Sequence, residues 1–246
     1  MSHPTPDVTS TPSSNASETL TDLRTRLSSE AEKKQLQTIQ TLEKFGDEGL
    51  GVLIDFLKER LDPPTTPVSV VDGKIYQILL QSETHSVREF LATHCPQGVV
   101  PLRSERNIDY TLLQEALANQ DFQAADRLTL QKLCALAGET AVQRKWLYFT
   151  EVDRLPVSDL QTVNTLWLVY SEAKFGFSVQ RDLWLSVGKD WDQLWTKIGW
   201  KSGNNWTRYP NEFIWDISAP RGHLPLSNQL RGVRVIASLL SHPAWG

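Results

Sequence analysis

Apolar residues recur at three- and four-residue steps along most of the chain, which is the spacing of one face of an α-helix. The first such stretch begins near Glu18 and is stopped by Pro63 and Pro64. Gly46 lies inside it where a helix needs a C-terminal cap, so we expect a helix, a short turn and another helix, as in HEAT-type hairpins. A second hairpin would complete a small bundle with helices at 71–80 and 87–94.

The second half of the chain has the same helical spacing. Asp109 and Asp121 are plausible N-caps, and Gly176, Gly188 and Gly199 lie at the ends of predicted helices as chain-reversing caps. We see no convincing strand, so the predicted fold class is all-α. The expected helices are 110–118, 122–136, 159–173, 179–187, 191–198 and 230–240.

Aromatic residues are distributed unevenly along the chain. All nine tryptophans lie at or after Trp146, and only four of the 22 aromatic residues precede residue 106. This asymmetry favours two domains with different roles. We expect a disordered tail at 1–17, an N-terminal helical bundle at 18–95, a linker at 96–106 and a C-terminal core domain at 107–246.

The composition and motifs of the chain argue against several classes of function. A net charge of −4 gives no general electrostatic reason to bind nucleic acid or anionic lipid. Cys95 and Cys134 stand far apart, which suggests neither a disulfide framework nor a thiolate metal site and fits a reducing compartment. No stretch approaches the roughly 20 apolar residues that span a bilayer. The motifs of hydrolases, phosphate-binding loops and zinc proteases are missing, so we expect no enzymatic activity.

The longest segment without a predicted helix, 199–226, is rich in aromatic residues. A loop of this size is uncommon inside a compact domain unless it is functional. Its rings indicate either a lid folded over the core or the wall of an apolar pocket. His223 is a local hydrogen-bonding residue or, less simply, a metal ligand. The aromatic residues of this loop are Trp200, Trp206, Tyr209, Phe213 and Trp215.

The last predicted helix carries two arginines. With Ser227 as its N-cap, Arg231 and Arg234 lie together, opposite the apolar residues Val233, Ile236, Ala237 and Leu240. Guanidinium groups near a helix N-terminus bind carboxylates well, although a solvated polar face is the simpler interpretation. Together with the aromatic loop, they suit a flat hydrophobic molecule with two carboxylates, which leaves porphyrins, bilins and aromatic or fatty acids open.

From about Asp109 onwards the chain resembles the genomes-uncoupled (fourth locus) tetrapyrrole-binding family. The resemblance lies in DLQTVNTLWLVYSEAKFGFSVQRDLW, YPNEFIWDISAPRGHLPLSNQLRGVR and SHPAW, and the N-terminal bundle resembles the accessory domain of cyanobacterial members. It implies a core shaped like a cupped hand that binds protoporphyrin IX and magnesium-protoporphyrin IX without being catalytic. It also implies that the protein stimulates magnesium chelatase, through the large porphyrin-binding subunit, and so regulates chlorophyll biosynthesis.

The resemblance also implies a set of site residues. They are Phe149, Val152, Trp206, Tyr209, Phe213, Asn228, Arg231 and Arg234. We expect no permanently bound cofactor. A bilin is a possible further ligand. If the bound pigment contains magnesium, its axial ligand would be water or His223. We also expect a cytoplasmic monomer without nucleic acid, and peripheral association with the thylakoid membrane stays open. The rival interpretations are a helical-repeat scaffold that binds only a protein partner and a tetrapyrrole-modifying enzyme.

Overall fold

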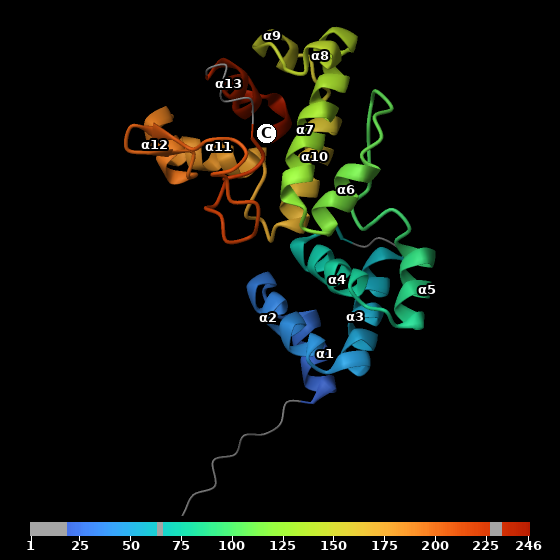
Figure 1. Ribbon diagram of the computed structural model, residues 1–246. Coiled ribbons are helices and arrows are strands. Elements are labelled where there is room, and N and C mark those ends of the chain that lie inside the picture. Colours follow the sequence, from blue (N-terminus) through green and yellow to red (C-terminus); the bar gives the residue numbers. More distant parts are fainter. Residues whose placement is uncertain (1–18, 63–65, 227–232) are drawn as a thin grey trace, which may run out of the picture.

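The computed structural model describes residues 19–62, 66–226 and 233–246, and helices are the dominant secondary structure there (Figure 1). This confirms the predicted all-α class. The N-terminal helices are α1 Leu20–Ser29, α2 Glu32–Glu43, α3 Gly46–Leu61, α4 Val70–Leu80 and α5 His85–His94. The remaining helices are α6 Thr111–Ala118, α7 Phe122–Ala137, α8 Glu139–Arg144, α9 Phe149–Val152, α10 Val157–Tyr170, α11 Phe177–Ser186, α12 Trp191–Lys197 and α13 Arg234–Ser241, followed by a 3₁₀ turn at Pro243–Trp245.

One small hairpin departs from the prediction. The strands β1 Lys201–Ser202 and β2 Asn205–Trp206 pair antiparallel within the aromatic loop. Gly203 lies between them with a φ of +58°, a conformation that glycine adopts without steric cost. Strands of two residues are too short to produce an alternating pattern, so the sequence did not reveal them.

Helix starts follow from the capping residues. The α7 N-cap is Asp121, as predicted, and its Oδ1 accepts a hydrogen bond from the Ala124 amide at 2.9 Å. Asp109 instead lies one position before the α6 N-cap, where it accepts from the Thr111 amide at 2.8 Å. The predicted N-cap Ser227 lies outside the described residues.

The N-terminal helices pack on the C-terminal part through α4. Nine of the eleven residues of α4 are buried, and Gly73 lies directly against Val169 of α10. The Gln77 amide donates to the Tyr170 carbonyl at 3.0 Å, and Lys74 pairs with Glu172 at 3.0 Å. The larger of two hydrophobic clusters in the described residues therefore runs from α1 to α13 and includes residues of both halves of the chain. The division into two domains stays a prediction.

Helix α10 is the centre of the C-terminal part (Figure 1). Its predicted apolar stripe is buried, as expected, and comprises Leu160, Val163, Trp167 and Tyr170. The Trp167 indole N–H donates to the Thr129 hydroxyl of α7 at 2.9 Å, and the Tyr170 hydroxyl donates to Gln114 of α6 at 2.7 Å. These bonds satisfy the polar ends of large buried rings and fix α10 against its neighbours.

A second apolar cluster supports the aromatic loop. Four indoles stack in a row from α11 through α12 to the start of the loop, with ring centroids 4.8, 5.2 and 5.3 Å apart for Trp184, Trp191, Trp195 and Trp200. Trp200 is fully buried, and its indole N–H donates to the His223 carbonyl at 2.8 Å. The start of the loop is thereby tied to its later part.

Candidate functional site

The aromatic loop supplies both core residues and exposed rings. Trp200 and Phe213 are buried, whereas Trp206 is 49% and Tyr209 43% exposed. Phe213 lies behind Tyr209, with the two ring centroids 6.2 Å apart, and Trp215 lies 5.8 Å from Tyr209. The buried rings therefore agree with a loop folded over the core, and the wall of an apolar pocket stays a prediction for the exposed rings.

His223 holds the loop together from inside. It is 1% exposed, its Nε2 accepts from the Ile214 amide at 3.2 Å, and its Nδ1 lies 2.7 Å from the Ile198 carbonyl. Because the Ile214 amide must donate, Nδ1 must carry the ring proton. Burial lowers the pKa of His223, which keeps the ring neutral. Both nitrogens are therefore occupied, and the structure does not support His223 as an axial ligand.

Two other predicted site residues meet between α9 and α13. The Arg234 guanidinium carbon lies 5.5 Å from the centre of the Phe149 ring, which is a cation–π contact. Phe149 is 37% exposed, but Val152 is fully buried and supports the site only from behind. Val233 was expected on the buried side of the last helix, but it is 39% exposed. It is the N-cap of α13 and therefore lies just before the helix begins. Asn228 and Arg231 lie outside the described residues.

Helix α7 contributes two residues that the sequence did not indicate. Asp126 is buried, and its Oδ1 accepts from the Leu226 amide at 2.7 Å, which fixes the end of the aromatic loop. Arg127 is exposed, and its positive charge lies near enough to Tyr209 to lower the pKa of that phenol against the stronger effect of burial. Burial raises the pKa of Asp126 to about 7, against the opposing effects of the Leu226 amide and Arg127.

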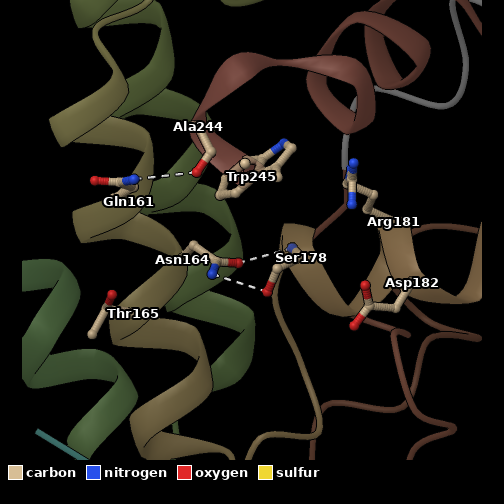
Figure 2. Close-up of a pocket in the computed structure, with 9 residues that line it drawn as sticks. Gln161, Asn164, Thr165, Ser178, Arg181, Asp182, Ala244 and Trp245 are labelled. Carbon is tan, nitrogen blue, oxygen red and sulfur yellow. Dashed lines mark hydrogen bonds between the residues drawn. The ribbon is translucent and has the colours of Figure 1, made fainter. Parts of the chain in front are cut away.

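A separate polar cleft lies between α10, α11 and the C-terminal turn (Figure 2). Its volume is about 490 Å³, and it contains none of the predicted site residues that the structure describes. Asn164 accepts from the Ser178 amide at 2.9 Å and donates to the Ser178 hydroxyl at 3.0 Å, while Gln161 donates to the Ala244 carbonyl at 3.2 Å. These bonds join the three elements. The polar lining also includes Arg181 and Asp182, and it does not suit an apolar macrocycle.

Neither a metal centre nor a membrane span is found in the described ranges. Within 19–62, 66–226 and 233–246, no three His, Cys, Asp or Glu side chains are grouped so that they could hold a metal ion. In the same residues no helix has the length and apolar character needed to cross a bilayer. Cys95 and Cys134 are both buried and free.

Comparisons with known proteins place the chain in one family. The GUN4-like profile matches residues 103–243, and the profile of the ARM-like repeat domain at the GUN4 N-terminus matches 12–96. The Ycf53-like protein of Synechocystis sp. is 53% identical over 229 residues, which cover 93% of this chain and 97% of that protein. The chloroplastic tetrapyrrole-binding protein of Arabidopsis thaliana is 39% identical over 145 residues, or 55% of each chain. The structure of GUN4 from Chlamydomonas reinhardtii matches with a TM-score of 0.56 and 43% identity over 59% of this chain and 93% of that one. The chain therefore belongs to the GUN4-like family.

Proposed function

We propose that the protein binds a tetrapyrrole with carboxylate side chains at the surface formed by the aromatic loop, α7, α9 and α13. The observation that carries the proposal is the cation–π contact of Arg234 with the exposed Phe149 ring, together with the exposed rings of Trp206 and Tyr209 in the aromatic loop. An aromatic ring contacts the flat face of a macrocycle, and a guanidinium binds its carboxylates through two parallel hydrogen bonds. The name of the Arabidopsis relative, a tetrapyrrole-binding protein, supports the same ligand class.

Within this class, the proposed ligands are protoporphyrin IX and magnesium-protoporphyrin IX, with a bilin as a further candidate. Burying roughly 200 Å² of macrocycle would contribute about 5 kcal/mol to the free energy of binding, before the cost of association is subtracted. The resulting affinity is moderate, as expected of a carrier. The two nitrogens of His223 are already bonded, so water is the proposed axial ligand of the magnesium in the bound pigment. Asn228 and Arg231 stay among the proposed site residues.

We further propose that the loaded protein stimulates magnesium chelatase by contacting the large porphyrin-binding subunit, and thereby regulates chlorophyll biosynthesis without catalysing a reaction itself. Exposed rings such as Tyr209 and Trp206 can bind one face or edge of the pigment. The opposite side then stays open for transfer. A purified chelatase assay with and without this protein tests the proposal, and an unchanged rate of magnesium insertion at saturating pigment would contradict it.

Substituting Arg234→Ala should weaken protoporphyrin IX binding about tenfold, because one charge-assisted hydrogen bond contributes roughly 1.5 kcal/mol. The measurement is a titration that follows the Soret band and tryptophan fluorescence. Arg181→Ala is the matched control, since Arg181 lies in the polar cleft and not at the proposed site. Equal affinity for wild type and Arg234→Ala would remove Arg234 from the site. Absence of any Soret change in the wild type would instead favour a scaffold that binds only proteins.

A further inference from the structure

The walls of the polar cleft between α10, α11 and the C-terminal turn are fixed by bonds within the protein (Figure 2). Asn164 of α10 makes two hydrogen bonds with Ser178 of α11, at 2.9 and 3.0 Å. The indole N–H of Trp245 donates to the Leu239 carbonyl at 2.5 Å, and its ring centroid lies 6.3 Å from that of Phe177. Binding in the cleft would therefore not require these side chains to be ordered first.

Two charged side chains of α11 line this cleft. In the ranges that the structure describes, neither Arg181 nor Asp182 makes a hydrogen bond or an ion pair. Arg181 is half-buried and Asp182 is exposed. Consecutive helical residues point roughly 100° apart, and Figure 2 shows these two side chains leaving α11 in different directions. The cleft thus presents a positive and a negative group at separate positions.

Hydroxyl groups and one indole ring complete the lining. The Thr165 hydroxyl of α10 has no hydrogen-bond partner among the described residues, and the Ser178 hydroxyl, which accepts from Asn164, can still donate its own O–H. The Trp245 ring supplies an apolar surface against which methylene groups can pack. The volume of about 490 Å³ is large enough for a small molecule, since ligand sites commonly range from roughly 300 to 1,000 Å³.

We propose that the polar cleft binds a small ω-amino acid, a molecule whose carboxylate and ammonium groups are separated by a short methylene chain. The carboxylate binds the Arg181 guanidinium, the ammonium binds the Asp182 carboxylate, and the chain packs on Trp245. A ligand with a single charge would be attracted by one of these groups and repelled by the other. An α-amino acid fits less well, because its charges share one carbon atom whereas the two side chains point apart.

This site is additional to the proposed tetrapyrrole surface, and none of the described residues of that surface lines it. Probes of equal carbon-chain length test it. δ-Aminovalerate carries its two charges at opposite ends, norvaline carries both at one end, valerate lacks the ammonium and pentylamine lacks the carboxylate. Each probe is titrated into the nitrogen-labelled full-length protein while NMR follows the Trp245 indole N–H resonance, which Trp245→Phe identifies. We expect a saturable shift with δ-aminovalerate and roughly tenfold weaker binding of the other probes, because each misses at least one charge-assisted hydrogen bond.

Two conservative substitutions test the two charges separately. Arg181→Gln should weaken binding of δ-aminovalerate about tenfold but leave pentylamine bound at least as tightly, since the amine makes no use of the guanidinium. Asp182→Asn should weaken δ-aminovalerate by a similar factor but leave valerate bound at least as tightly. Arg88→Gln is the matched control and should change no affinity, because Arg88 is an exposed arginine of α5 that does not line the cleft.

A parallel loss of affinity for every probe in either variant would overturn the proposal, because the substituted residue would then only support the walls of the cleft. A Trp245 resonance that did not move in the wild type up to about 50 mM δ-aminovalerate would also overturn it. So would binding of valerate, pentylamine or norvaline that was as tight as binding of δ-aminovalerate. Well-dispersed indole resonances in each variant check that it is folded.

Discussion

Replacing Gly73 with alanine should destabilise the whole protein by about 2 kcal/mol, the usual cost of overpacking a dense interior. A methyl group at this position would lie 2.6 Å from the Cγ1 of Val169 and closer still to the Val169 carbonyl oxygen. The oxygen belongs to the backbone of α10, which cannot move without disturbing the buried Trp167 and Tyr170. The clash must therefore separate α4 from α10. Urea denaturation measures the change in the free energy of unfolding.

Gly51 provides the matched control because it is also a helical glycine, in α3, but a Cβ there would meet no atom within 4 Å. Gly51→Ala should stabilise the protein by up to about 1 kcal/mol, since alanine restricts the unfolded chain and favours the helix. If the two substitutions changed the stability in the same direction and by the same amount, close packing at Gly73 would be refuted.

The same experiment tests how the two halves of the chain fold. We propose that 18–95 and 107–246 are separate domains in their architecture but unfold together, because α4 is buried in a core that both share. A single transition in the wild type is then expected from fluorescence, which reports the C-terminal tryptophans, and from circular dichroism, which reports all helices. Two separate transitions would contradict this coupling.

Long periodic segments made most of the fold predictable. The predicted helix at 179–187 is α11 at Phe177–Ser186, and Gly188 and Gly199 have positive φ just after the ends of α11 and α12, as expected. Gly176 also has positive φ, but it is the N-cap of α11 and does not end the helix before it. The short helices α8 and α9 escaped prediction because six and four residues contain too few turns to show a period. Residues 96–106 form no helix, yet Val99 and Val100 are buried, since this segment packs on α6 through Gln114.

The candidate site was less predictable than the fold because long-range contacts decide which side chains are exposed. Trp200 and Trp206 are six residues apart in the same loop, but one is fully buried and the other about half exposed. Nothing in the local pattern distinguishes them. Arg127 likewise looks like an ordinary polar residue on a helix, and only the fold brings its charge near Tyr209. Arg234 and Phe149 did meet, although 85 positions separate them in the sequence.

Substituting Asp126→Asn should stabilise the protein relative to wild type increasingly as the pH rises. The pKa of an aspartate is 3.8 in the reference state, and burial raises that of Asp126 to about 7 in the folded protein. Between these values the folded state binds more protons than the unfolded state, so the free energy of unfolding of the wild type falls as the pH rises. Asparagine does not titrate, and its side-chain oxygen can still accept from the Leu226 amide.

From pH 5 to pH 8 the stability difference between Asp126→Asn and wild type should grow by about 2 to 3 kcal/mol, because two pKa units separate pH 5 from the folded-state pKa. Urea denaturation at each pH measures it. Asp216→Asn is a control whose effect on stability has the opposite sign. Hydrogen bonds from Ser218 lower the pKa of the exposed Asp216, so its charged form stabilises the folded protein above the reference pKa. Asparagine lacks this contribution. If the stability difference between Asp126→Asn and wild type stayed constant from pH 5 to pH 8, Asp126 would be ionised in the folded protein over that whole range.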